Sequence, residues 1–146
     1  MLVREIPAWT TGLDERMSEM ELFYKTLKWP VIGLLITGGV HFTIEAIWPD
    51  LKTFFIPPVL APLLLAYGFW VGYRAIQVGG TYLHAIVAGA ILGILPIVLE
   101  VVGFGVILGR GVPEGELAGI FGFAYILFGS LIGAGFVLSR EATGAK

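Results

Sequence analysis

The chain has 146 residues, of which 57% are hydrophobic and 14% are charged, and its formal net charge is −2. A soluble domain carries about a quarter charged residues, so this chain has too few polar side chains to cover a surface in water. The composition therefore predicts an all-α integral membrane protein in the lipid bilayer. At about 20 residues per spanning helix, the length leaves room for four spans and short loops.

Several classes of chemistry are disfavoured by what the sequence lacks. It contains no cysteine and only two histidines, which excludes disulfides and thiolate metal sites and argues against a multi-histidine metal centre. No basic block points to nucleic acid as a partner. Because no nucleophile–base pair, HExxH motif or Walker motif is present either, we expect neither an independent enzyme nor a bound cofactor.

Residues 1–28 form the one substantial polar stretch. Apolar residues recur there at helical spacing, namely Leu13, Met17, Met20, Tyr24 and Leu27. The opposite face is acidic and carries Asp14, Glu15, Glu19 and Glu21. We expect a cytoplasmic amphipathic helix that lies on the membrane surface and turns into the first span. Its acidic face is a candidate docking surface for a soluble partner; the alternative is a solvated face with no partner.

Four apolar stretches predict a transmembrane domain over residues 29–139, with spans at about 29–48, 59–74, 82–108 and 117–138. Pro30 is expected in the first turn of the first span, where its missing N–H costs nothing. The proline-rich residues 53–62 are expected to form a re-entrant or interfacial shoulder, and residues 110–116 a polar loop. Span 82–108 exceeds the hydrocarbon thickness, so it should tilt, kink at Pro96 or fray near Gly103–Gly105.

The distribution of basic residues predicts the orientation. With four spans, one side of the membrane would hold Arg4, Arg16, Lys25, Lys28, Arg74, Arg140 and Lys146. The other side would hold Lys52 and Arg110. The positive-inside rule then places both termini, including the tail at 140–146, in the cytoplasm of a cell with the protein in its inner membrane.

An internal similarity suggests a tandem repeat of a helical hairpin. Residues 35–47 align with residues 90–102, so that Gly38 matches Gly93 and Glu45 matches Glu100. Both stretches would begin on the cytoplasmic side, so the repeat would be parallel, with its pseudo-two-fold axis along the membrane normal. The alternative is a chance alignment of two apolar segments.

Three ionisable residues inside the predicted spans are the candidate proton or cation site: Glu45, Glu100 and His41. Such groups are costly in lipid and are functional candidates by default. Around the helix axis, each glutamate lies about 20° from the glycine seven residues earlier in the chain. Faces that bear glycine are those where helices pack. At about 24 Å and 27 Å from the cytoplasmic ends, the two carboxylates could be neighbours that share a proton or cation. The alternative is that both lie just inside the outer interface and reach water or a backbone partner.

The two histidines do not predict a haem site within one chain. His41 would lie about 18 Å from the cytoplasmic end of its span and His84 only about 3 Å into its own. A single haem requires both ligands at one level, so only two copies of His41 in a dimer could supply it.

Glycines at helical spacing predict close helix packing or an oligomer interface. Those on the second and third spans are Gly68, Gly72, Gly89 and Gly93. Those on or next to the fourth span form a stripe of Gly115, Gly119, Gly122, Gly129 and Gly133. The stripe places the fourth span either at the centre of the bundle or at a contact between copies.

Two functions are compatible with these features. The first is a homo-oligomeric transporter or channel in which the two glutamates, assisted by His41, bind or relay a proton or cation. The second is a non-catalytic subunit of a larger membrane-bound complex of respiratory type, in which the glycine faces pack against other integral membrane subunits.

Overall fold

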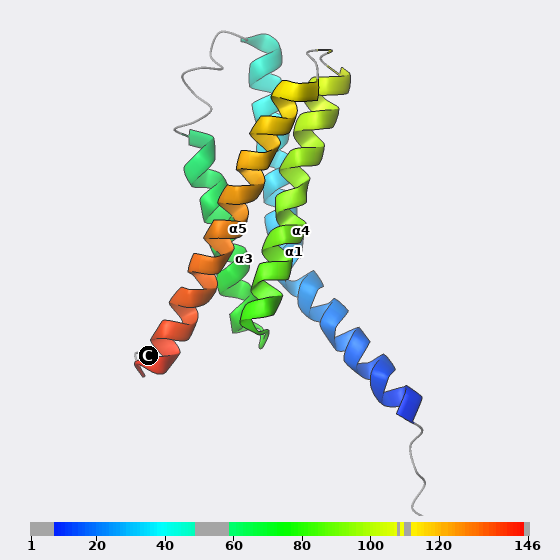
Figure 1. Ribbon diagram of the computed structural model, residues 1–146, viewed down its shortest axis with the longest axis vertical. Coiled ribbons are helices and arrows are strands. Elements are labelled where there is room, and N and C mark those ends of the chain that lie inside the picture. The colour runs from blue at the N-terminus through cyan, green and yellow to red at the C-terminus, as the bar shows by residue number, and fades with distance from the viewer. Residues whose placement is uncertain (1–7, 49–58, 108, 110–111, 145–146) are drawn as a thin grey trace, which may run out of the picture.

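The computed structural model describes residues 8–48, 59–107, 109 and 112–144, and every regular element in these ranges is helical. In chain order the elements are α1 (Ala8–Ile47), α3 (Ala61–Gln77), α4 (Tyr82–Glu100), the π-helix η3 (Val101–Ile107) and α5 (Val112–Ala142). Figure 1 shows them as an elongated bundle in which successive α-helices run in opposite directions and η3 continues α4. The expectation of an all-helical protein is confirmed.

Three of the described helical segments are long and apolar enough to cross a membrane. They are Glu19–Ile47, Tyr82–Ile107 and Gly119–Ala142, with mean hydropathies of 1.5, 2.5 and 2.0. The helix α3 has 17 residues, which corresponds to a length of about 26 Å. The three longer segments fit a multi-pass membrane protein.

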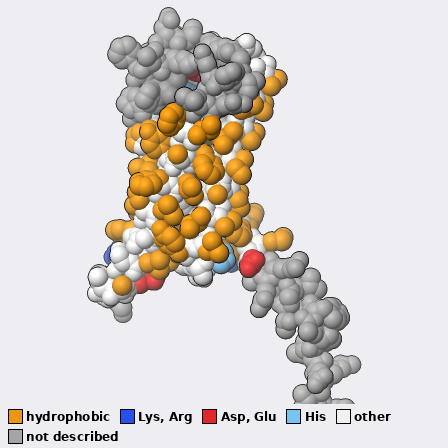
Figure 2. Space-filling model, viewed as in Figure 1, with side chains coloured by type: hydrophobic (Ala, Val, Ile, Leu, Met, Phe, Trp, Pro, Cys, Tyr) orange, Lys and Arg blue, Asp and Glu red, His pale blue; other side chains and the backbone are white. Residues whose placement is uncertain are grey.

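The outer surface of the bundle is apolar along most of its length. Figure 2 shows hydrophobic side chains covering the middle of the bundle, with the visible charged side chains towards its ends. Large side chains such as Ile36, Leu83 and Phe128 are more than 60% exposed. A water-soluble monomer rarely exposes a continuous apolar surface of this extent, whereas lipid chains would cover it without cost.

The first helix departs from its expected form. Residues 8–47 make one continuous helix, with Pro30 inside it rather than in a first turn. Pro30 and Thr26, one turn earlier, are both buried, at the point where α1 enters the bundle. Figure 1 shows the earlier part of α1 diverging from the other helices. A proline removes one helical hydrogen bond and crowds the preceding turn, which explains a bend without a break.

The start of the last helix also differs from the sequence-based expectation. The fifth helix begins at Val112, so residues 112–116 are helical rather than part of a polar loop. Pro113 fits the first turn of a helix because the N–H that it lacks would have no partner there. In the third apolar stretch, the α-helical pattern ends at Glu100 and continues as η3, which is the region where a distortion was expected. The predicted shoulder at residues 53–62 lies largely outside the described residues.

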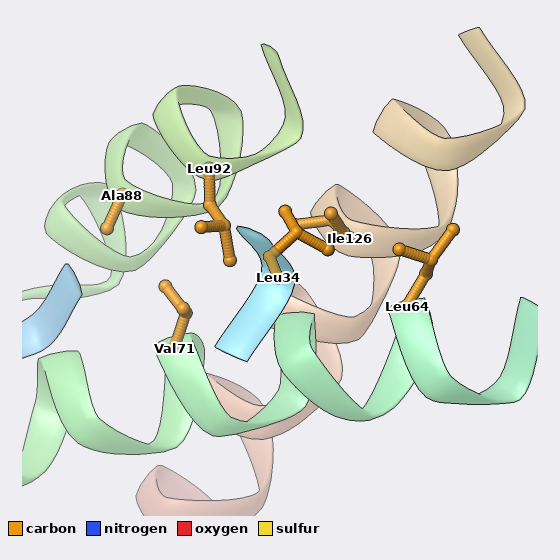
Figure 3. Close-up of a cluster of buried hydrophobic side chains, with 6 residues drawn as sticks. All are labelled: Leu34, Leu64, Val71, Ala88, Leu92 and Ile126. Carbon is orange, nitrogen blue, oxygen red and sulfur yellow. The ribbon is translucent and has the colours of Figure 1, made fainter. Parts of the chain in front are cut away.

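The core joins all four α-helices. Figure 3 shows the buried side chains that form it: Leu34 from α1, Leu64 and Val71 from α3, Ala88 and Leu92 from α4, and Ile126 from α5. Small residues let the backbones approach around this cluster, and α5 packs closely against both α3 and α4. The helix α1 packs less closely against this group.

Glycines on α3 and α5 pack against each other's helices in a reciprocal way. Gly68 and Gly72 of α3 lie against the backbone at Ile126 and Ser130 of α5, while Gly129 and Gly133 of α5 lie against the backbone at Leu65 and Phe69 of α3. A side chain at any of these glycines would collide with backbone atoms of the facing helix. Such contacts require small residues on both helices.

Candidate functional site

The candidate site lies where the second half of α1 packs against the end of α4 and the start of η3. A Cβ atom at Gly38 would lie 2.8 Å from Leu99, and one at Gly103 would lie 3.1 Å from the ring of Phe42. These contacts place the Gly38–Glu45 turns of α1 beside residues 99–103. The residues on the inner face of those turns are therefore brought to the α4 and η3 boundary.

The contact at the centre of the site joins His41 to Glu100. The Nε2 atom of His41 lies 3.7 Å from Oε1 of Glu100, and each side chain is 14% exposed. The distance allows an ion pair when the imidazole is protonated and is longer than a direct hydrogen bond. Residues far apart in the chain thus form an acid–base pair that is largely shielded from the surroundings.

Glu45 adds a second carboxylate to this region. It lies one helical turn beyond His41, on the same face of α1, and only 2% of its surface is exposed. Burial of an ionised carboxylate is strongly unfavourable unless a charge or hydrogen bond compensates, so a buried glutamate is suited to holding a proton or a cation. The structure joins Glu100 to His41; the predicted sharing of an ion by the two carboxylates stays a prediction.

A hydroxyl pair that sequence reasoning did not identify lies one turn before His41. The Oγ1 atom of Thr37 is 2.9 Å from the hydroxyl of Tyr67 on α3, and it also donates to the carbonyl oxygen of Gly33 at 2.9 Å. The ring of Tyr67 packs against Gly33. The signal available in the sequence was the spacing of Thr37, His41 and Glu45, each four residues from the next on α1.

The second histidine has a different position and role. His84 lies in the first turn of α4, where its Nδ1 atom accepts a hydrogen bond from the backbone N–H of Thr81 at 3.0 Å. The hydroxyl of Thr81 in turn accepts from the N–H of His84 at 3.4 Å. This reciprocal capping satisfies two donors that the helix start leaves open. His84 therefore lies at the opposite end of α4 from the Glu100 site.

The remaining predicted glycines also meet helices of the same chain. On α4, a Cβ atom added at Gly89 would lie 2.6 Å from Ser130, and one added at Gly93 would lie 2.8 Å from Phe123. On α5, a Cβ atom added at Gly119 would lie 2.7 Å from Ile97, and one added at Gly122 would lie 2.9 Å from Pro96. The surroundings of Gly115 lie outside the described residues. The α4–α5 seam thus continues the close packing seen between α3 and α5, with α5 between the two other helices.

A buried serine also joins α4 to α5 and was not identified from the sequence. The hydroxyl of Ser130 donates to the carbonyl oxygen of Ala85 at 2.7 Å, and no part of Ser130 is exposed. A serine in an apolar helix is often satisfied by its own backbone, so its sequence position alone does not indicate a contact between helices.

Among the described residues, no group of three or more His, Cys, Asp or Glu side chains could hold a metal ion. The chemistry that the described residues do assemble is that of acid–base groups, with an imidazole and two carboxylates near a pair of hydroxyls. No protein-family model, curated protein or solved structure matches this chain.

Proposed function

We propose that this chain is a membrane protein that takes up and releases a proton or cation at an acid–imidazole cluster, defined as His41, Glu45 and Glu100. The observation that carries the proposal is the 3.7 Å contact between His41 and Glu100 beside a glutamate that is 2% exposed. Ionisable groups inside an apolar bundle are costly to keep and typically mark ion pathways or proton relays.

We propose four spans, with α3 as the shortest. Its 17 residues are at the lower limit of about 17–25 residues for a spanning helix. The π-helical turn at residues 59–60 directly precedes it, and α3 runs alongside α5 in Figure 1. Four spans place both termini on one side, and the positive-inside rule makes that side the cytoplasm.

The reciprocal glycine contacts support a duplicated helical hairpin. In such a repeat, α1 would correspond to α4 and α3 to α5. If Gly68 corresponds to Gly129 and Gly72 to Gly133, each of these glycines lies against the helix that bears its counterpart. A parallel repeat about an axis along the membrane normal produces this arrangement.

The proposed transport function is tested with purified protein in liposomes. An imposed gradient of protons, Na⁺ or K⁺ should dissipate faster with the protein than in empty vesicles. Glu45→Gln should reduce that flux at least tenfold, because the amide cannot bind and release a proton or balance a cation. Glu141→Gln is the matched control, since Glu141 is exposed near the end of α5. Wild-type protein that moves none of these ions would refute the proposal.

The second candidate is a subunit of a larger membrane-bound complex. The feature that favours it is the part of α1 that diverges from the bundle in Figure 1, where Met20 is 72% and Tyr24 62% exposed. A projecting helix of this kind can bind a partner subunit. Mild detergent extraction from the native membrane followed by mass analysis distinguishes the cases, because a subunit would be recovered with other polypeptides in fixed proportion.

Copies of this chain would have to associate through a surface other than the glycine faces of α3 and α5. Gly68, Gly72, Gly129 and Gly133 are covered by helices of the same chain. The exposed face of α1 is available for contact between copies. Gly39 lies on α1, and a Cβ atom added there would have no heavy atom within 4 Å. The mass of the protein–detergent complex would show whether copies associate.

A further inference from the structure

We infer that the transported ion is a proton and that Tyr67 and Thr37 form the next relay point on the cytoplasmic side of the acid–imidazole cluster. The inference rests on the proposed function and specifies the substrate of the same site. It assigns to the Tyr67 hydroxyl on α3 a role in conduction rather than in packing alone.

The position of the hydroxyl pair supports this assignment. Thr37 precedes His41 by one turn of α1, a rise of about 6 Å along the axis, on the same inward face. Tyr67 reaches this point from α3, with its hydroxyl 2.9 Å from Oγ1 of Thr37. Carboxylate, imidazole and hydroxyl groups therefore follow one another along α1 from Glu45 towards the expected cytoplasmic end.

The hydrogen-bond geometry allows the pair to switch direction. Oγ1 of Thr37 donates its one hydrogen to the Gly33 carbonyl at 2.9 Å, so the Tyr67 hydroxyl donates to Thr37 in this arrangement. If Thr37 turns its hydrogen to the Tyr67 oxygen, the direction of the bond reverses. A pair with two such arrangements can pass a proton and then return to its starting state.

The transfer starts once the Thr37 hydrogen has turned from the Gly33 carbonyl to the Tyr67 oxygen. Protonated His41 then gives a proton to a water molecule admitted between it and Thr37, and that water gives one of its own protons to Oγ1 of Thr37. Thr37 releases its original proton to the Tyr67 oxygen, and Tyr67 gives its phenolic proton to a second water molecule on its cytoplasmic side. Both hydroxyls and His41 end neutral, and the second water ends as hydronium, so one positive charge has moved.

The same atoms are poorly suited to a metal ion. The Thr37 oxygen already contacts the Gly33 carbonyl and the Tyr67 hydroxyl, and metal sites for hard cations use several carboxylate or carbonyl oxygens. The described residues contain no group of three acidic, histidine or cysteine side chains that could bind a metal. Hydroxyl groups add a path for protons without adding a charged ligand.

The test compares Tyr67→Phe with Tyr73→Phe in liposomes containing a pH-sensitive dye. Tyr67→Phe keeps the ring that packs on Gly33 and removes only the hydroxyl, so proton flux should fall at least tenfold while the melting temperature changes little. Tyr73→Phe should retain wild-type flux, because its hydroxyl accepts an exposed local bond from Gln77. Wild-type flux in Tyr67→Phe would overturn the inference.

Thr37 provides a second test that remains informative if Tyr67→Phe folds poorly. Thr37→Ser keeps the hydroxyl and should conduct, whereas Thr37→Val keeps the shape and should not. Equal flux in the two variants would overturn the inference. Wild-type protein that carries Na⁺ or K⁺ but no protons would overturn it and leave the proposed function standing, and wild-type protein that carries no ion would refute both.

Discussion

Gly72 on α3 lies directly against the backbone of Ser130 on α5, where one added methyl group would collide with the Ser130 carbonyl oxygen and lie 2.9 Å from the N atom of Ala134. The neighbouring atoms are backbone atoms of a central helix, so they cannot rotate away as a side chain could. The distance between α3 and α5 therefore depends on the absence of a side chain at this position.

Gly72→Ala should destabilise the protein by about 1–3 kcal/mol, as expected for overpacking of a well-packed contact. The free energy of unfolding in detergent micelles measures the effect. The matched control is Gly39→Ala, because nothing lies within 4 Å of a Cβ at Gly39 and alanine is the better helix former by about 1 kcal/mol. Equal destabilisation by the two variants would contradict the packing described here.

Ser130→Ala should cost about 0.6 kcal/mol, the average for a hydrogen bond between membrane helices. The loss is modest because the Ala85 carbonyl that accepts from Ser130 belongs to helix α4, where a helical N–H also reaches it. Ser139→Ala is a suitable control, since its hydroxyl makes an exposed bond to Phe136 within α5. A cost above that of Gly72→Ala would show that Ser130 does more than join α4 to α5.

His41 and Glu100 should be energetically coupled. In a double-mutant cycle with His41→Gln and Glu100→Gln, the interaction free energy should fall within roughly 0.5–3 kcal/mol, the range for residues in direct contact. Thermal or denaturant unfolding of the four proteins in detergent supplies the values. Strict additivity would mean that the 3.7 Å approach contributes nothing to stability.

The absence of cysteine makes the topology directly testable. Single cysteines introduced at Lys28 and Arg140 should react with a membrane-impermeant maleimide only when the cytoplasmic side is accessible, whereas one at Lys52 should react from the outside. Four spans require Lys28 and Arg140 to behave alike. Opposite reactivity at these two positions would show three spans, with α3 not crossing the membrane.

The sequence predicts the helical class well because apolar length is a strong signal. It predicts helix ends less well, as Pro30 and Pro113 show. A proline is compatible both with a helix start and with a bent helix interior, and the surrounding packing decides between them. Residues 112–116 are polar enough to be mistaken for a loop, yet they form the first turns of α5.

The residues of the candidate site also differ in how well the sequence predicts them. His41, Glu45 and Glu100 are conspicuous in the sequence because charge is rare in an apolar span. His41 lies within ion-pair distance of Glu100 because of the way α1 is rotated against α4, and periodicity within one helix does not determine that rotation. Thr37, Tyr67 and Ser130 are common residue types whose importance comes only from their partners on other helices.

The limited contact of α1 with the rest of the bundle has a mechanical consequence. Close packing at glycines holds α3, α4 and α5 together, while polar groups from Thr37 to Glu100 lie in the seam that fastens α1 to them. Gain or loss of a single charge in that seam would therefore alter how firmly the first helix is held, so ion occupancy and helix movement would be linked by the same few side chains.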